Sequence, residues 1–478
     1  MQFRSDAYID GQWRQGASRF KVYNPANQEV IAEVPDLGAA EAEQAVAAAH
    51  AAFPAWAAKT AKERAQVLRA WYELMMGDID RLARLICMEG GKPLAEARGE
   101  AAYGAAFAEW FAEEAKRAYG RVIPTTTATR SHGTIKQPVA VFAAITPWNF
   151  PMAMITRKAA PALAAGCTIV LKPPHQTPLT ALALAELGEK AGLPRGAFNV
   201  VTTEHASAVG KVLCESPLVR KFSFTGSTAV GKKLGAMCVG STVKKVSLEL
   251  GGNAPLLVFA DADLDVAVKG AIASKFRNAG QTCVCANRIL VEDAVYDAFA
   301  KKFADAVAKL KVGSGDQDGV EIGPLIDDKA IDKVSSMVAE ALADGATAVT
   351  GGKKHGAGAQ FYTPTVLTGV TRQMRVNREE IFGPVAPLIR FKDEDEAVAI
   401  ANDTPFGLAG YFFTKDVNRA WRVAERLEYG MVSINEGVYS NEVIPFGGWK
   451  ESGLGREGGV EGLEEYLETK FVNFGGFA

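Results

Sequence analysis

Short apolar runs alternate with helical segments between Val139 and Leu250, and this pattern limits the possible folds more than any other feature of the sequence. Strand-sized apolar runs occur at 139–145, 168–171, 198–201, 221–224 and 243–250. Helical patterns cover 180–191, 206–214 and 229–237, and a further helix opens near Pro151. Such alternation is typical of βαβ units around a parallel sheet. We therefore predict a doubly wound α/β fold that binds its ligand beyond the carboxyl ends of the strands.

The rest of the chain has a less regular pattern. The first 120 residues predict mostly helices, with periodic segments at Glu41–Phe53, Lys62–Met76 and Glu96–Ala118. Residues 121–136 are rich in β-branched side chains and predict an extended ribbon. A second αβ region runs from Gly251 to about Pro445, with a Gly-rich turn at 351–359. The strand-like stretch Tyr466–Phe474 is expected to pair with the ribbon or with another subunit.

Composition excludes several classes of protein. The 478 residues predict two to three domains, and the 53 Lys and Arg against 55 Asp and Glu leave no basic footprint for nucleic acid. The longest uncharged stretch, 137–156, contains three prolines and is a poor membrane span. The N-terminus also lacks the apolar region of a signal peptide. We therefore expect a cytoplasmic protein with no membrane or nucleic-acid partner.

Cysteine and histidine usage argues against a disulfide framework or a metal centre. Six cysteines in a chain of this length are too few and too scattered for a disulfide scaffold. None of the five histidines has a metal-ligand spacing with a cysteine. No G-x-S-x-G nucleophile elbow is present either, so a hydrolase of that type is not predicted.

Polar residues stand at the ends of the predicted strands, where a ligand is expected. They are Asn149, Lys172, Thr225, Gly226, Ser227 and Glu249. Residues 226–232 match G-x-x-x-x-G-K, but Lys233 stands where a phosphate-binding loop of an ATPase needs Ser or Thr. A glycine turn that leads into a helix still offers free backbone N–H groups to a phosphate. A simple tight turn is an equally good interpretation of this motif.

Cys283 is the candidate nucleophile. It follows Gly280, Gln281 and Thr282, small or polar residues that suit a turn at a cleft, whereas the other distant cysteines are expected to be inert packing. A thiol needs a base or a positive field to become the reactive thiolate. Glu249 lies in an apolar run, where a carboxylate is costly unless it is paired or functional.

Six motifs together resemble the signature set of the aldehyde dehydrogenase superfamily, in the same order and over essentially the whole chain. They are TPWNFP at 146–151, FTGST at 224–228, LELGG at 248–252, GQTC at 280–283, EIFGP at 380–384 and PFGGWK at 445–450. The resemblance implies that Cys283 attacks an aldehyde and that Asn149 with the Cys283 backbone N–H stabilises the oxyanion. It also implies that Glu249 activates the water that hydrolyses the resulting thioester.

The same resemblance implies an NAD or NADP cofactor. Lys172 and Glu380 would hold ribose hydroxyls, Phe382 would pack near the nicotinamide ribose, and Gly226 and Ser227 would lie near the pyrophosphate. The other implied contacts are Trp148, Thr225 and Leu250. The family often has Glu at the position of His175, and its absence should permit NADP. A protonated His175 could favour the 2′-phosphate, whereas a solvated histidine would be neutral in this choice.

The substrate region most resembles the succinate-semialdehyde dehydrogenase branch, in CVCANR at 283–288 and NEGVYSNEV at 435–443. In that branch two arginines and a serine grip the substrate carboxylate, and the matching residues here are Arg157, Arg277 and Ser440. Taken alone, Arg157 would be interpreted as a solvated cation on a helix beside Lys158. An arginine clamp also suits glutarate semialdehyde, 2-oxoglutarate semialdehyde or sulfolactaldehyde. Succinate semialdehyde remains the first candidate.

The resemblance implies three structural parts and a homo-oligomer, either a dimer or a tetramer. Residues 1–122 and 139–250 would bind the cofactor, 251–445 would carry Cys283, and 123–138 with 460–478 would form a small β flap for oligomerisation. Two rivals stand beside this prediction: a catalytically inactive binding protein and a general dehydrogenase for neutral aldehydes. Cys285, two residues after Cys283, is either a reversible disulfide partner or a spare pocket cysteine.

Overall fold

The computed structural model describes residues 3–476, and its centre is an eight-stranded sheet. The strand order is β2-β1-β9-β8-β7-β10-β11-β21, and the five strands from β9 to β11 are parallel. Their bounds are β1 Ala7–Ile9, β2 Gln12–Arg14, β7 Val141–Ile145, β8 Thr168–Lys172, β9 Phe198–Val200, β10 Val219–Thr225, β11 Lys245–Glu249 and β21 Gly453–Leu454. The predicted doubly wound parallel sheet is confirmed.

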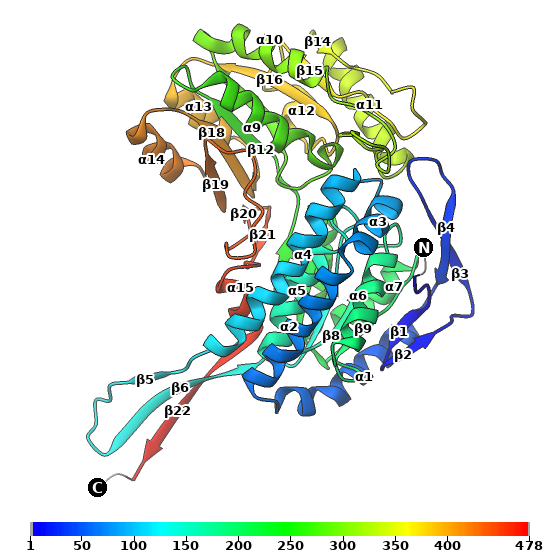
Figure 1. The fold of residues 1–478 in the computed structure, drawn as a ribbon. Helices are drawn as coiled ribbons and strands as arrows, with labels where there is room; N and C mark the ends of the chain where they lie inside the picture. Colours follow the sequence, from blue (N-terminus) through cyan, green and yellow to red (C-terminus); the bar gives the residue numbers. More distant parts are fainter. Residues whose placement is uncertain (1–2, 477–478) are drawn as a thin grey trace.

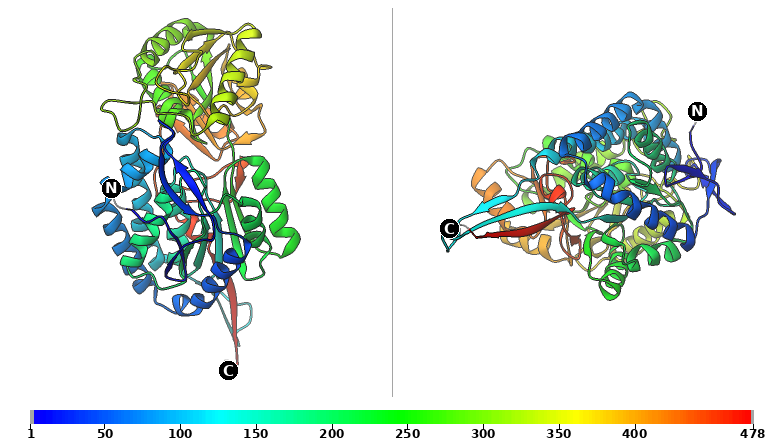
Figure 2. Two further views of the ribbon diagram at one scale, coloured as in Figure 1. Left: turned by 90° about the vertical axis from the view of Figure 1, so that its right-hand side faces the viewer. Right: turned by 90° about the horizontal axis from the view of Figure 1, so that it is seen from below.

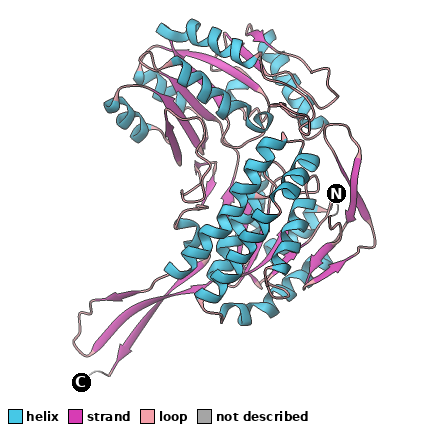
Figure 3. Ribbon diagram, in the orientation of Figure 1, coloured by secondary structure: helices cyan, strands magenta, loops and turns pink. Residues whose placement is uncertain are grey.

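Helices cover both faces of this sheet because its strands carry apolar side chains on both sides. Phe142 and Ala144 of β7 pack on one helical layer, whereas Val141, Ala143 and Ile145 pack on the other. The first layer contains α2 Ala61–Gly77, α3 Ile79–Gly90, α4 Leu94–Glu114, α5 Ala153–Ala165 and α6 Leu179–Lys190. The second contains α1 Ala39–Ala57, α7 Ala206–Glu215 and α8 Thr228–Ser241. Figures 1 and 3 show these layers.

Helix boundaries follow local signals in the sequence. Thr60 and Glu63 form a capping box at the start of α2, and α3 and α5 end at Gly91 and Gly166, both in the left-handed conformation. These devices satisfy backbone groups that a helix end leaves without partners. The helices predicted from periodicity over the first 120 residues are therefore present, with somewhat different ends.

The prediction was incomplete for the first 35 residues, which form strands and not helices. Besides β1 and β2 there is a separate hairpin of β3 Arg19–Tyr23 and β4 Val30–Pro35. The turn between β1 and β2 is Asp10-Gly11, with both residues at positive φ, which is a common hairpin turn. β1 and β2 have three residues each and are too short to show a periodic pattern, so the Asp10-Gly11 turn was the available sequence signal for this hairpin.

A second, seven-stranded sheet follows in the chain, with the order β14-β15-β16-β13-β12-β18-β19. Its strands are β12 Ala254–Val258, β13 Ala286–Glu292, β14 Thr347–Thr350, β15 Thr365–Thr368, β16 Val385–Phe391, β18 Ala409–Phe413 and β19 Met431–Ile434. The nearby helices are α9 Leu264–Phe276, α10 Tyr296–Val307, α11 Asp328–Ala343, α12 Arg375–Arg378, α13 Glu394–Asn402 and α14 Val417–Arg426. β17 Phe406–Gly407 pairs with β20 Trp449–Lys450, and α15 spans Glu461–Glu464.

A three-stranded ribbon extends away from the body of the molecule (Figures 1 and 2). It contains β5 Arg121–Ile123, β6 Arg130–Pro138 and β22 Leu467–Gly475, with β6 in the middle. β22 pairs with β6 along its whole length, so the predicted pairing of the C-terminal strand with the ribbon is confirmed within the chain. Within residues 3–476, no helix is long and apolar enough to cross a membrane.

Candidate active site

A cavity of about 270 Å³ lies where the strand ends of the first sheet face the second sheet. β7 and β10 are neighbours in the first sheet, although β8 and β9 separate them in the chain, so the strand order reverses at this point. Such a switch point is where open α/β sheets bind ligands. The cavity brings together many of the predicted site residues: Trp148, Asn149, Thr225, Gly226, Ser227, Leu250, Cys283, Glu380 and Phe382. Lys333 also lines it and was not predicted.

The loop that carries Cys283 is held in an unusual backbone conformation. Asn278 and Ala279 have φ of 52° and 55°, a region that residues other than glycine rarely adopt. The Gln281 side chain anchors the loop, since its amide donates to Asn278 O over 3.1 Å and accepts from Ile326 N over 2.9 Å. A Cβ at Gly252 would meet the Cys283 carbonyl oxygen at 2.6 Å. The GQTC and LELGG motifs therefore pack against each other through close backbone contact.

The Cys283 thiol is partly exposed and protonated in this environment. Burial raises its pKa far above the ordinary value, and the Glu249 and Glu380 carboxyls raise it further, while Arg157 has the opposite effect. The positive field at this site is therefore too weak to produce a thiolate. A proton acceptor is required, and Glu249 is the carboxyl with the largest effect on the thiol.

Glu249 ends β11 with both carboxyl oxygens buried and without a hydrogen-bond partner among the described residues. Its pKa lies well above the ordinary value, mainly because of burial and then because of the Glu457 carboxylate; Arg157 and Lys158 oppose this shift. A carboxyl with a raised pKa is a stronger base than an ordinary carboxylate, which suits a group that accepts protons. The sequence interpretation of Glu249 as an expensive, functional carboxyl agrees with this environment.

Hydrogen bonds hold both the side chain and the backbone carbonyl of Asn149. Its Nδ2 donates to Gln281 O over 2.9 Å, and its own carbonyl accepts from Lys92 Nζ over 2.9 Å and from Asn278 Nδ2 over 3.1 Å. Lys92 is buried and paired with Glu100, a support that sequence reasoning missed. One N–H of the Asn149 amide remains to stabilise a developing oxyanion.

Two features of the first sheet suit a dinucleotide. Lys172 is buried at the end of β8, where its Nζ bonds the Pro173 carbonyl over 3.1 Å, and burial lowers its pKa to about 8. α8 begins at Ser227, whose side chain makes no capping bond, and the nearby Thr225 Oγ1 is buried without a partner in the described structure. A helix N-terminus with free donors can bind phosphate oxygens, and a buried ammonium at the end of another strand of the same sheet can bind ribose oxygens.

The opposite wall of the cavity comes from the EIFGP motif. Glu380 accepts from Gly252 N over 3.1 Å, and burial raises its pKa to about 7. Phe382 has a φ of 55° and its ring meets the edge of Trp148, with centroids 5.6 Å apart. These residues border the same cavity as Cys283, which suits the nicotinamide end of a cofactor.

His175 is exposed and lies close to Lys172. Partial desolvation and the Lys172 charge lower its pKa, while the Glu204 carboxylate has the opposite effect. The ring is therefore neutral at neutral pH in the free protein. Of the two alternatives for His175, a solvated, neutral histidine fits this environment better than a protonated one.

Arg157 is fully buried in α5, so its interpretation as a solvated cation is wrong. Its Nε lies 3.2 Å from Glu457 Oε2, and its guanidinium lies 4.0 Å from the centre of the Phe446 ring. Lys158 is also buried, pairs with Glu457 and donates to Ser223 Oγ over 2.9 Å. Two buried cations thus share one carboxylate that the sequence pattern did not reveal.

Arg277 follows α9 and donates to Ser440 Oγ over 2.8 Å, as the predicted clamp requires. Its guanidinium also lies 4.8 Å from the centre of the Phe150 ring. A Cβ at Gly437 would clash with the Gly270 backbone, so the loop that carries Ser440 packs directly on α9. The charges of Arg157 and Arg277 both act to lower the pKa of Tyr103, and Arg157 donates a hydrogen bond to the Tyr103 hydroxyl over 3.4 Å. The two arginines therefore lie in one neighbourhood.

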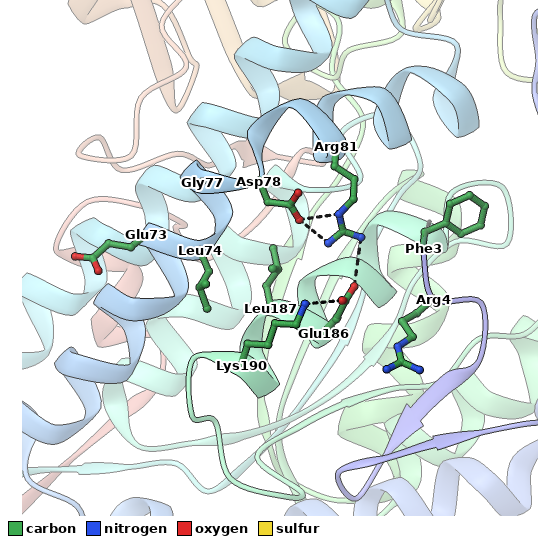
Figure 4. Close-up of a pocket in the computed structure, with 10 residues that line it drawn as sticks. All are labelled: Phe3, Arg4, Glu73, Leu74, Gly77, Asp78, Arg81, Glu186, Leu187 and Lys190. Carbon is green, nitrogen blue, oxygen red and sulfur yellow. Dashed lines mark hydrogen bonds and ion pairs between the residues drawn. The ribbon is translucent and has the colours of Figure 1, made fainter. Parts of the chain in front are cut away.

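A larger hollow of about 890 Å³ lies between α2, α3 and α6, away from these residues (Figure 4). Arg81 pairs there with Asp78 and Glu186, and Lys190 also pairs with Glu186. Because these charged side chains are paired with one another, the hollow presents no reactive group. Over the described part of the chain, no cluster of His, Cys, Asp or Glu could hold a metal ion.

Comparisons with known proteins show which proteins this chain is similar to. Residues 13–472 match the model of the Aldehyde dehydrogenase family. The chain is 59% identical to an Escherichia coli "Succinate-semialdehyde dehydrogenase [NADP(+)] GabD", with 99% of this chain and 98% of the relative covered. It is 58% identical to a Pseudomonas aeruginosa "Glutarate-semialdehyde dehydrogenase" (99% and 98% covered) and to a Pseudomonas putida "3-sulfolactaldehyde dehydrogenase" (99% and 97%). A crystal structure of an E. coli NADP dependent enzyme superposes with a TM-score of 0.98 at 59% identity and covers 99% of this chain and 98% of its own.

Proposed function

The chain belongs to the aldehyde dehydrogenase family, and from that premise we propose that it oxidises an anionic semialdehyde with NAD(P) through a covalent intermediate on Cys283. One observation carries the proposal: Cys283 and Asn149 share one cavity with most of the residues proposed to bind the dinucleotide, among them Ser227 at the start of α8. The buried Glu249 carboxyl is close enough to that thiol to raise its pKa. The presence of these groups in one place disfavours an inactive binding protein.

In this mechanism Glu249 takes the proton of Cys283, and the thiolate attacks the aldehyde carbon to give a hemithioacetal. The free N–H of Asn149 and the Cys283 backbone N–H stabilise the oxyanion. A dinucleotide held in the cavity would supply the hydride acceptor that the adduct needs in order to become a thioester. Glu249 passes the thiol proton to solvent and then removes a proton from water. The resulting attack on the thioester releases the acid and the Cys283 thiolate, which takes a proton from Glu249 to restore the thiol.

The cofactor proposal rests on Lys172, the α8 N-terminus and Glu380. Lys172 would bind ribose hydroxyls, Gly226 and Ser227 the pyrophosphate, and Glu380 the nicotinamide ribose. Trp148, Thr225, Leu250 and Phe382 would enclose the ring end. With no acidic side chain at His175, we propose that both NAD and NADP are accepted.

The substrate proposal rests on charge. Arg277 and Ser440, with Arg157 nearby, would hold the carboxylate of the substrate, and succinate semialdehyde is the first candidate. Relatives named for glutarate semialdehyde and sulfolactaldehyde support the wider class of acidic aldehydes as the alternative.

We further propose that the ribbon of β5, β6 and β22 joins subunits into a cytoplasmic homodimer or homotetramer. It exposes large apolar side chains, with Val122 at 89%, Phe471 at 58% and Phe474 at 56%. In this proposal, the first sheet and its helices form the cofactor domain and residues 251–445 form the catalytic domain. Analytical ultracentrifugation of the wild type and of a Val122→Glu, Phe471→Glu variant tests the assembly.

The test of function follows NADH or NADPH formation with succinate semialdehyde, glutarate semialdehyde and neutral butanal. A kcat/KM at least ~100-fold higher for one acidic aldehyde, about 2.7 kcal/mol of discrimination, is the expected result. The Cys283→Ala variant should form no reduced cofactor. Equal rates on butanal would leave a general aldehyde dehydrogenase, and no activity with any aldehyde would refute the proposal.

A further inference from the structure

A second, very small cavity lies between the nucleophile loop and the Arg277–Ser440 pair. It has a volume of about 10 Å³, the room that one water molecule or one ligand oxygen needs. Its wall includes Arg277, Thr282, Tyr411, Tyr439 and Ser440. The cavity therefore connects the residue before Cys283 with the residues proposed to hold the substrate anion.

Tyr439 brings an unused hydroxyl to this cavity. Its oxygen is buried and makes no hydrogen bond of good geometry within the described structure, with only the Tyr411 hydroxyl nearby, and Thr282 Oγ1 on the same wall is also buried and without a partner. Its ring stacks on Tyr411, with centroids 5.1 Å apart and planes 21° apart. Such groups are rare in folded proteins, because a buried hydroxyl without a partner costs about 1–3 kcal/mol.

The neighbouring tyrosine determines which hydrogen bonds Tyr439 can make. Tyr411 donates its proton to the Val284 carbonyl over 2.7 Å, so only its oxygen remains to accept. If Tyr439 donates to that oxygen, its own oxygen is left as an acceptor for a ligand hydroxyl. Tyr439 also precedes Ser440 directly and lies close enough to Cys283 for the thiolate to raise its pKa. The Tyr439 side chain thus lines the cavity between the nucleophile loop and the Arg277–Ser440 pair.

We propose that Tyr439 is a specificity-determining residue that binds a hydroxyl on the carbon chain of the substrate, between its aldehyde and its anionic group. The inference rests on the proposed function and narrows it to hydroxylated acidic aldehydes. A site with buried polar groups rejects an analogue that leaves them without partners. A substrate without the hydroxyl would therefore be turned over less well.

Matched substrate pairs test this inference. Succinate semialdehyde is compared with 2-hydroxy-4-oxobutanoate and 3-hydroxy-4-oxobutanoate, and 3-sulfopropanal is compared with 3-sulfolactaldehyde. In the wild type we expect at least one hydroxylated member to exceed its deoxy partner about tenfold in kcat/KM. Tyr439→Phe should bring that ratio close to one. Tyr411→Phe is the matched control, and it should lower kcat for both members of a pair by a similar factor, because it frees the Val284 carbonyl.

Inhibition by the acid products gives a second measurement that does not depend on turnover. Malate should bind more tightly than succinate to the wild type, and Tyr439→Phe should remove the difference. Equal kcat/KM within every pair would mean that the cavity holds only water, and would overturn the inference. A Tyr439→Phe effect that is equal for both members would assign Tyr439 a structural role. The absence of activity with every aldehyde would instead refute the proposed function.

Discussion

Arg277 is the cation that a substrate anion can use, because its charge is not already balanced. In the described part of the chain it forms no ion pair, and its guanidinium bonds the Ser440 hydroxyl over 2.8 Å. Arg157, in contrast, is paired with Glu457 over 3.2 Å. The two arginines of the predicted clamp are therefore unequal, and replacing Arg277 should affect substrate recognition most directly.

The size of the effect follows from the contact that would be lost. A hydrogen bond to a charged group contributes about 1.5–3 kcal/mol, and two unit charges 4 Å apart near a protein surface interact by about 4 kcal/mol. A loss of roughly 2–4 kcal/mol predicts a 30- to 900-fold lower kcat/KM for succinate semialdehyde in Arg277→Ala. Butanal has no anion to lose, so its kcat/KM should change much less, by no more than about threefold.

The assay is reduced-cofactor formation with both aldehydes, at cofactor saturation. Arg277→Lys is the matched control: it keeps the charge but loses the planar fork, so it should fall between the wild type and Arg277→Ala. A similar loss on succinate semialdehyde and on butanal would refute the clamp and make Arg277 a structural residue.

Three further substitutions test the other charged groups. Glu249→Gln should lower both the burst rate of reduced cofactor in stopped-flow and the steady-state rate at least ~100-fold, because it removes the acceptor of the Cys283 proton and the base for thioester hydrolysis; a burst at the wild-type rate would contradict the first of these roles. Glu380 has a raised pKa of about 7, so the wild type should bind NAD(P) more weakly as pH falls through 7 and the carboxyl protonates. Glu380→Gln should show no such pH step in a fluorescence titration. Glu457→Gln leaves Arg157 and Lys158 without their carboxylate and should lower the free energy of unfolding by about 3–5 kcal/mol; an unchanged urea midpoint would show that the pairing contributes little.

The sequence predicted the part of the site that depends on local chain geometry. Parallel strands place their carboxyl ends at one edge of a sheet, so Asn149, Thr225 and Glu249 could be grouped once the strands were recognised. Glu249 indeed pairs in register with Thr225, and Lys172 with Ile145. The six motifs extended this grouping to Cys283 and Glu380, which come from the second sheet region.

The supporting charges could not be predicted in the same way. Lys158 and Arg157 follow each other on one helix, and such a pair usually marks a solvated face. Here α5 is buried on all sides, because β8, α2 and α4 enclose it together with the C-terminal segment that carries Glu457. Glu457 lies about 300 residues further along the chain, so periodicity gives no signal for the pairing. Lys92 and Asn149 are also distant in the sequence, so periodicity gave no signal for the support that Lys92 gives to Asn149.

The buried charges around Glu249 explain why this carboxyl can serve as both acceptor and donor of a proton. Arg157 and Lys158 bring two positive charges, and Glu457 brings one negative charge, so the group is neutral only when Glu249 is ionised. Charges in a protein interior are stable when they are balanced, which favours the ionised form. Burial and the Glu457 carboxylate favour the protonated form, and their combined effect is the larger one. Because the opposing effects are both strong, a charge that arrives with the substrate or leaves with the acid product can shift the proton on Glu249. The mechanism requires such a shift between thiol activation and thioester hydrolysis.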